Sequence, residues 1–199
     1  MFWADAFAWI NSDSGLALPA DYYCPTRDVA DGRLSKIVRE AQAAGFSQQH
    51  APLIAALTGE LTANCFDHNL GAWRDIAGCW LSWTGADLAL LIVVADRGQG
   101  IRSSLRRADP GLQTDRQALA TALTKHLSGR QPERRGRGLK FIVASLKSQL
   151  AGSTFQLMSG SARFKATFPL ETEVVNHITE GHPPLLGTLA SLELRAPAT

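Results

Sequence analysis

The pattern of apolar and polar residues predicts two helices in the first third of the chain. Between Thr26 and Gly45 the apolar side chains recur at helical spacing, and the glycine is a suitable C-terminal stop. A second helix is expected from about Ala51 to Asn69. Ahead of both, the segment Met1 to Ile10 is rich in aromatic residues. The pattern over Met1 to Gly45 therefore offers one convincing helix.

The middle of the chain carries the pattern of a β-hairpin. Gly78 to Thr84 and Leu88 to Ala95 fit two strands joined by a short turn, and the second is apolar enough to lie inside a sheet. A proline-containing loop, Glu171 to Gly187, precedes the last expected strand. Three strands are expected to finish the chain, at Thr154 to Ser159, Arg163 to Phe168 and Thr188 to Leu194.

Two further segments lie between the hairpin and the final strands. From Ile101 to Arg135 the chain is charged and rich in turns, and we expect a mobile lid in which Thr114 and Asp115 cap a short helix. After Leu139 the apolar residues follow the spacing of an amphipathic helix that ends near Gly152.

Composition and charge narrow the class of protein. With 199 residues, 45% of them hydrophobic and 19% charged, the chain is long enough for one well-packed domain. The net charge of +2 comes from 20 basic and 18 acidic residues, so no overall field attracts nucleic acid or a membrane surface. The longest apolar run, Leu88 to Ala95, is far shorter than the roughly 18 residues of a membrane span.

The cysteines and the N-terminus bear on the compartment. Cys24, Cys65 and Cys79 have neither disulfide nor zinc-ligand spacing, so we expect core thiols in a reducing compartment. The N-terminal segment has no basic leader and does not fit a signal peptide. A cytoplasmic location is expected.

The second helix carries the first chemical signal. Glu60, Asn64 and His68 recur every fourth residue, and leucines at the same pitch turn this polar ridge toward the interior. Internal hydrogen bonds that anchor the helix would explain such a ridge. Facing a cleft, the same three groups can serve as base, metal ligand and phosphate partner.

A second signal lies at the end of the apolar strand, in Asp96-Arg97-Gly98-Gln99-Gly100. A carboxylate at a strand end can accept a hydrogen bond from an adenine amino group, and glycines let the backbone approach a ring closely. The same five residues also fit an ordinary strand-ending turn.

The third signal, Arg134 to Lys140, opens directly into the amphipathic helix. Glycines before a helix expose backbone N–H groups to an anion, and the helix dipole and nearby arginines favour a triphosphate there. A solvated basic helix start or a nucleic-acid patch is the alternative. Nucleic acid is not expected, because the cluster is compact and lacks interleaved aromatic residues.

Taken in order, these elements resemble the GHKL ATPase superfamily, which includes gyrase-type topoisomerases, heat-shock chaperones, histidine kinases and anti-sigma-factor serine kinases. The resemblance covers roughly Ala51 to Pro197. Three stretches are similar to the N, G1 and G2 boxes, and a fourth to the last strand of the family: Glu60 to Asn69, Asp96 to Gly100, Gly136 to Leu139 and Gly187 to Leu194.

The fold that this resemblance implies is α+β, a Bergerat-type α/β sandwich with a mixed, mostly antiparallel sheet and helices on one face. Residues 1–50 would be an N-terminal helical extension, packed as one structural unit with an ATP-binding domain of residues 51–199. The N-terminal aromatic segment has no counterpart in the family, and the strand and loop between Thr154 and Gly187 are longer than the family's usual ending. Both are candidates for partner recognition.

The resemblance also implies roles for single residues with ATP and Mg²⁺ as cofactors. Asn64 would coordinate the metal, and Asp96 would bind the adenine amino group with support from Thr188. Gly98 and Gly100 would shape the base pocket. By resemblance, contact with the phosphates is expected from His68 and from the G2 box residues Gly136, Gly138 and Leu139. Nearby basic residues are expected to contact the phosphates on the ground of their charge alone: Arg130, Arg135, Arg137 and Lys140.

Glu60 separates subclasses of the superfamily, because typical histidine kinases carry Asn at this position. A carboxylate there can orient or deprotonate a water or serine hydroxyl for attack on the γ-phosphate. The only upstream histidine, His50, lacks the acidic neighbour of a phosphoacceptor motif. We therefore expect Glu60 to be catalytic, in an ATPase or a protein serine/threonine kinase of anti-sigma-factor type.

Two alternatives stay open at this point. One is an ATP-dependent regulatory binding module without significant turnover, and the other is the catalytic domain of a histidine-kinase-like protein. Besides ATP, we expect a protein partner that is regulated or phosphorylated, and a homodimer is also open. Neither nucleic acid nor a membrane is an expected partner.

Overall fold

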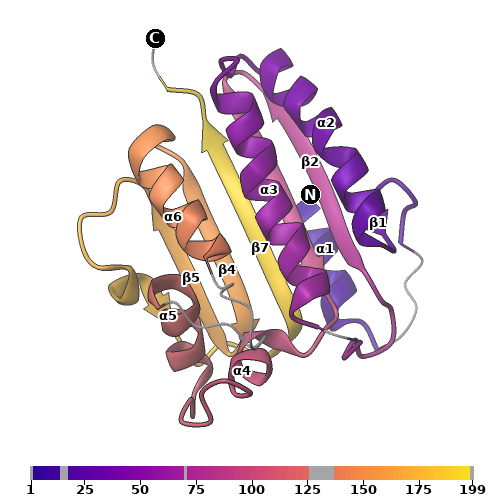
Figure 1. Cartoon of the computed structure of the whole chain (residues 1–199), viewed down its shortest axis with the longest axis vertical. Coiled ribbons are helices and arrows are strands. Elements are labelled where there is room, and N and C mark those ends of the chain that lie inside the picture. The colour runs from indigo at the N-terminus through magenta and orange to yellow at the C-terminus, as the bar shows by residue number, and fades with distance from the viewer. Residues whose placement is uncertain (1, 14–17, 70, 126–136, 198–199) are drawn as a thin grey trace.

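The computed structural model describes residues 2–13, 18–69, 71–125 and 137–197. In this part the chain is α+β, with helices packed on a single seven-stranded sheet (Figure 1). The helices are α1 (Phe2–Asn11), α2 (Arg27–Ala43), α3 (His50–Asp67), α4 (Gly100–Leu105), α5 (Asp115–Thr124), α6 (Gly138–Gln149) and the short 3-10 helix η1 (Val174–His177). The strands are β1 (Tyr23–Cys24), β2 (Cys79–Ala86), β3 (Ala89–Asp96), β4 (Thr154–Gly160), β5 (Ala162–Thr167), β6 (Ile178–Thr179) and β7 (Leu185–Arg195).

The sheet runs in the order β1-β2-β3-β7-β4-β5-β6, and neighbouring strands are antiparallel. The expected hairpin is confirmed: β2 and β3 pair along their length, and Asp87 and Leu88 adopt left-handed conformations in the turn. The last strand inserts between β3 and β4, so Thr188 comes to lie opposite Asp96. Residues far apart in sequence thus meet at one end of the central strands.

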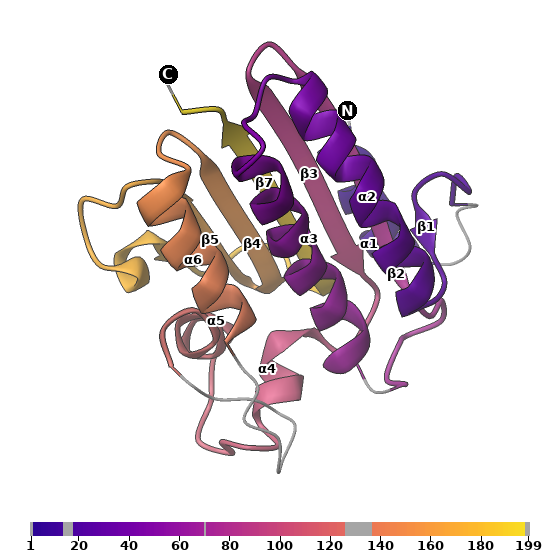
Figure 2. The ribbon, with the colours of Figure 1, turned by 45° about the horizontal axis from the view of Figure 1, so that its top comes forward.

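Helices lie on both sides of this sheet, as Figure 2 shows. Alternate residues of β3 belong to different clusters: Ile92 and Val94 pack in the core beneath α2, α3, α5 and α6, whereas Val93 and Ala95 pack with α1. The expected layer of helices on one face is thus formed by α2, α3, α5 and α6. The exception is α1, which the aromatic N-terminal segment forms and which covers apolar side chains of the opposite face.

The segment expected to be a lid is folded over residues 101–125. Thr114 caps α5 through a complete capping box, as predicted, and Asp115 accepts hydrogen bonds from the backbone and hydroxyl of Ser161. Leu119 and Leu123 are buried in the main core. This part is a pair of packed helices, α4 and α5, rather than a turn-rich loop, and the rest of the expected lid lies outside the described residues.

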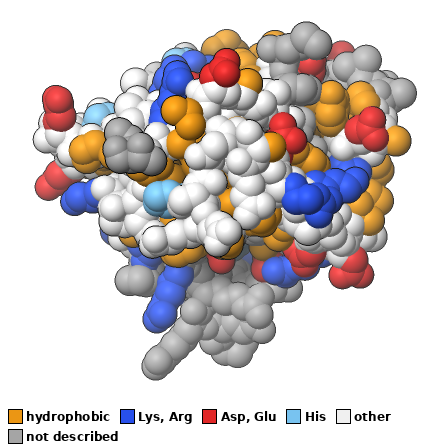
Figure 3. Space-filling view, turned by 90° about the horizontal axis from the view of Figure 1, so that it is seen from above, with side chains coloured by type: hydrophobic (Ala, Val, Ile, Leu, Met, Phe, Trp, Pro, Cys, Tyr) orange, Lys and Arg blue, Asp and Glu red, His pale blue; other side chains and the backbone are white. Residues whose placement is uncertain are grey.

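The distribution of charged side chains and of cysteines in the structure agrees with what the composition predicts. On the face drawn in Figure 3, acidic and basic side chains are interspersed with apolar and neutral ones. The cysteines are buried and free, as expected of core thiols: Cys24, Cys65 and Cys79. Within the described ranges, no helix combines the length and apolar character needed to cross a membrane.

Candidate functional site

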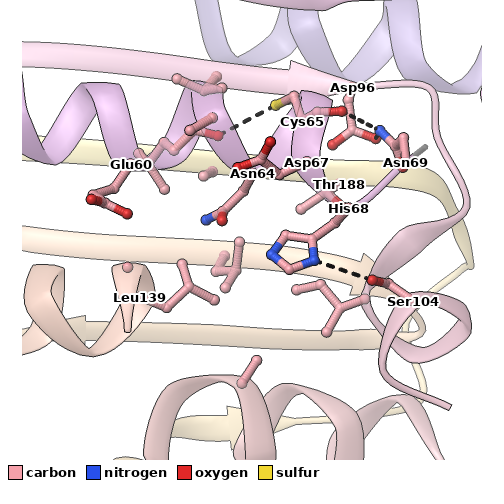
Figure 4. A pocket seen from close by; sticks show the side chains of 18 of the residues that line it. Glu60, Asn64, Cys65, Asp67, His68, Asn69, Asp96, Ser104, Leu139 and Thr188 are labelled. Carbon is pink, nitrogen blue, oxygen red and sulfur yellow. Dashed lines mark hydrogen bonds between the residues drawn. The ribbon is translucent and has the colours of Figure 1, made fainter. Parts of the chain in front are cut away.

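A cavity of about 750 Å³ opens between α3, α6, α4 and the ends of β3 and β7. Its wall is built from elements that are far apart in sequence, and Figure 4 shows their side chains converging on it. The predicted site residues that line it are Glu60, Asn64, His68, Asp96, Gly100, Arg137, Gly138, Leu139 and Thr188. Arg130, Arg135 and Gly136 lie outside the described residues.

Asp96 lies at the inner end of the cavity and is 4% exposed. Its Oδ1 accepts hydrogen bonds from Asn69 Nδ2 at 3.0 Å and from the backbone N–H of Gly98 at 2.8 Å. The Cys65 thiol and the Thr188 hydroxyl also favour the ionised form of the carboxyl and so lower its pKa. Burial raises the pKa of Asp96 to about 6, although these hydrogen bonds oppose the rise. The group is a buried acceptor that is ionised at neutral pH.

Asn69 joins the end of α3 to the loop that follows Asp96. Its side-chain amide also donates to the carbonyl of Cys65 at 2.7 Å, and its Oδ1 accepts from the backbone N–H of Gln99 at 3.1 Å. The sequence reasoning placed Asn69 in the N box but assigned it no role. Asn69 and Asp96 are 27 positions apart, so no local spacing in the sequence relates the two and the contact could not be predicted.

The glycines of the second signal have different roles. A Cβ on Gly98 would collide with the Asn69 side chain, so this glycine packs against Asn69 and does not line the cavity. Gly98 can therefore shape the base pocket through Asn69, and its expected role there stays a prediction. Gly100 does line the cavity, at the start of α4 with φ +74°, where a side chain would be strained.

The first residues of β7 press closely on Asp96. Gly187 has φ +149°, and a Cβ there would collide with the Asp96 carbonyl oxygen. Thr188 follows and lies opposite Asp96 in the pairing of β7 with β3, and its hydroxyl lowers the pKa of the Asp96 carboxyl. The expectation that this threonine supports the site is consistent with that contact.

The other end of the cavity lies between the ridge of α3 and the N-terminus of α6. Glu60 and Asn64 are half-buried there, and in Figure 4 the Asn64 amide points into the space between the two helices, toward Leu139. A Cβ on Gly138 would collide with Glu60 Oε2, so the absence of a side chain lets the carboxylate lie against the start of α6. Arg137 precedes the helix and is exposed.

Two residues at the rim were missed by the sequence reasoning. Arg27, at the start of α2, pairs with Asp67 of α3, with 3.1 Å between Nη1 and Oδ1, and both line the cavity. The N-terminal region therefore contributes to the wall. His68, the last residue of the predicted ridge, has its Nδ1 3.3 Å from Ser104 Oγ of α4. Lys140 does not line the cavity, and burial lowers the pKa of its ammonium group.

The donor set bears on the expected metal. Among the residues that the structure describes, no group of three or more His, Cys, Asp or Glu side chains can hold a metal ion. Mg²⁺ that is bound with a nucleotide takes most of its ligands from phosphates and water, and needs one or two protein oxygens. The amide oxygen of Asn64, inside the cavity, is suited to be one of these protein ligands.

In comparisons with protein-family models, curated proteins and solved structures, none matches the chain.

Proposed function

We propose that the protein is a Mg-ATP-binding domain of the GHKL type with a Bergerat fold, acting as an ATPase or as a protein serine/threonine kinase. The observation that carries the proposal is the pairing of two features in one cavity. A buried carboxylate, Asp96, stands at one end, and the N-terminus of a twelve-residue helix, α6, opens at the other.

The inner end suits adenine. Val94, Leu157 and Ala190 give it apolar walls, and a planar base is buried favourably against such surface. The ionised Asp96 can only accept hydrogen bonds, and the adenine amino group is a donor. A base with an oxygen at that position would place an acceptor against an acceptor. This polar contact would select adenine over guanine.

The outer end suits a triphosphate with its metal. The first N–H groups of α6 have no partner within the helix, and the helix dipole attracts negative charge. Arg137 adds a guanidinium beside them. Asn64 faces this region from α3, where its amide oxygen would hold Mg²⁺ against the phosphates.

Glu60 supplies the group that turnover requires. It lies one helical turn before Asn64 and beside the start of α6. There its carboxylate would orient a water or serine hydroxyl and accept its proton as the γ-phosphoryl group moves to that oxygen and ADP leaves.

The same contact favours a second candidate, an ATP-dependent regulatory module without significant turnover. A carboxylate beside a helix N-terminus is also a stabilising cap. Glu60 would then support α6 structurally, and binding of ATP would change how the domain contacts a protein partner.

Calorimetric titration of ATP in the presence of Mg²⁺ tests the binding proposal. In Asp96→Asn, the amide oxygen would stay with the two donors at Oδ1, and the NH₂ group would face Thr188 and the adenine amino group. We expect ATP affinity to fall by about 100-fold or more. Asp87→Asn, the same change in the exposed turn at the other end of β3, is the matched control. Equal affinities in all three proteins would refute the adenine-reading role.

A further inference from the structure

Arg97, the residue after Asp96, is fully buried although it carries a charge. Its guanidinium forms a two-pronged ion pair with Asp75, with Nε to Oδ1 at 2.7 Å and Nη2 to Oδ2 at 2.5 Å. This contact holds the pKa of the Asp75 carboxyl below its usual range. Because a buried charge is costly unless all of its donors are satisfied, the position of Arg97 is tightly specified.

The remaining donors of Arg97 bind the C-terminal end of α1. Nη1 donates to the carbonyl of Trp9, to that of Ile10 at 3.3 Å and to Ser12 Oγ at 3.0 Å, while Nη2 donates to the Ser12 carbonyl at 2.9 Å. The guanidinium carbon also lies 5.6 Å from the centre of the Trp9 ring. The Trp9 and Ile10 carbonyls belong to the last turn of α1, which carries the negative end of the helix dipole and so attracts the guanidinium.

A second arginine, Arg74, also binds the C-terminal end of α1, although it lies outside the segment Asp96 to Gly100. Arg74 Nη2 donates to the carbonyls of Ile10 at 3.0 Å and of Ser12 at 2.8 Å. Its side chain therefore shares the anchoring of α1 with Arg97. It differs from Arg97 in its place in the chain, 22 residues before Asp96.

Asp96 and Arg97 are consecutive, and their side chains leave the end of β3 toward opposite faces of the sheet. Asp96 enters the cavity, and Arg97 enters the cluster beneath α1. The backbone of Arg97 is further held by its carbonyl, which accepts from the N–H of Arg74 at 2.9 Å. The residue that follows Asp96 is therefore fixed through both its backbone and its side chain, on the face of the sheet opposite the cavity.

Resting on the proposed function, we propose that Arg97 is a positioning residue for the base-binding carboxylate, through which α1 sets the selectivity of the site for adenine. Binding groups must be held to within about 0.5 Å for a directional hydrogen bond to be effective. On the cavity side Asp96 is restrained by Asn69 and the Gly98 N–H, and on the opposite face of the sheet α1 restrains it through Arg97.

The test compares ATP with inosine triphosphate, which has the same sugar and phosphates but carries an oxygen in place of the 6-amino group. Arg97→Lys keeps the charge and loses the fork that binds Asp75 and α1 together. We expect its affinity for ATP to fall about tenfold and its affinity for inosine triphosphate to change less than about twofold. Arg39→Lys, the same change at an exposed position of α2, is the control and should keep both affinities.

Near-ultraviolet circular dichroism shows whether each variant is folded. If Arg97→Lys does not fold, Asp75→Asn carries the test, since Asp75 is 30% exposed and the change keeps its shape; it should lower the preference for ATP about threefold. Equal loss of both nucleotides, or no loss, in a folded variant overturns the positioning role. Absence of ATP binding in the wild-type protein overturns the proposed function as well, which separates the two failures.

Discussion

The two ends of the cavity are built differently. At the inner end, Asp96 and Asn69 are each 4% exposed and bonded to each other and to the loop that follows the strand. At the outer end, Glu60 and Asn64 are half-buried and Arg137 is exposed. One end is a closed network within the protein, and the other presents polar groups to the cavity.

This difference predicts how each end responds to substitution. Polar groups in a closed network depend on one another, so removing one leaves a buried partner unsatisfied and destabilises the fold. Polar groups that face an open cavity keep access to water, so their loss affects ligand chemistry more than folding. Single substitutions at each end of the cavity test that contrast.

The largest effect is expected from Glu60→Gln at the outer end. The change keeps the shape and removes the charge that would accept the proton of the attacking group, so turnover should fall about 100-fold or more. ATP affinity should stay within about threefold of wild type. Phosphate release and calorimetric titration measure the two quantities, with the exposed Glu171→Gln as control. Turnover that is unchanged in Glu60→Gln would make this carboxylate a structural cap.

Substitution of Asn69, which follows α3, should destabilise the fold more than substitution of Asn64, which lies within α3. Asn69→Ala leaves the Asp96 carboxylate, the Cys65 carbonyl and the Gln99 N–H without their partner, which costs about 2 kcal/mol. Asn64→Ala removes a half-buried group from the cavity and should change the free energy of unfolding by less than about 0.5 kcal/mol. Urea denaturation gives both values. Equal losses would erase the contrast between the two ends.

The metal dependence of ATP binding should reside in Asn64. Chelation of Mg²⁺ should lower the ATP affinity of the wild-type protein about tenfold and that of Asn64→Ala by less than about threefold. Titrations with and without a chelator measure this, and Asn176→Ala, an exposed asparagine in η1, serves as control. An undiminished response in Asn64→Ala would remove this residue as the metal ligand.

The smallest effect concerns pH at the inner end. Burial raises the pKa of Asp96 to about 6, and the amino group of adenine binds the ionised form, so adenosine affinity should be level above pH 7. It should fall about tenfold between pH 7 and pH 5 as the carboxyl is protonated. Adenosine is the probe because the terminal phosphate of ATP changes charge in the same range. A level profile in the wild type would exclude the carboxylate contact.

The same group makes an opposite contribution to folding. Its pKa in the folded protein lies above the value of 3.8 for an unperturbed aspartate, so the folded state binds more protons between about pH 4 and pH 6. The contribution is fully present below about pH 4 and is lost as the pH rises through about 6. Asp96→Asn should remove this part of the pH dependence of the free energy of unfolding.

Much of the architecture is readable from local pattern. Helical spacing located α2, α3 and α6, and the hairpin of β2 and β3 follows from two apolar runs around a short turn. The Thr114 cap of α5 was readable because a capping box is a local motif. The short elements α4, β1, η1 and β6 were missed, since two to six residues carry too little periodicity to be recognised. The expectation of a single helix over Met1 to Gly45 was wrong, because the aromatic-rich segment also forms α1 and has too few polar residues to mark a helical stripe.

The site residues likewise fall into those that local sequence patterns indicate and those that only long-range packing brings together. Glu60, Asn64 and His68 share a ridge because four-residue spacing on a helix is a local property, and the chemistry of Asp96 follows from its place at the end of an apolar strand. The partners of these residues come from long-range pairing. Thr188 reaches Asp96 through the insertion of β7 beside β3, and Arg27 reaches Asp67 through the packing of α2 on α3. The sequence gives Arg97 no role beyond its place in a turn motif. Its burial and its hydrogen bonds follow from the packing of α1 on the opposite face of the sheet, because burial and the pairing of charges depend on which distant segments pack together.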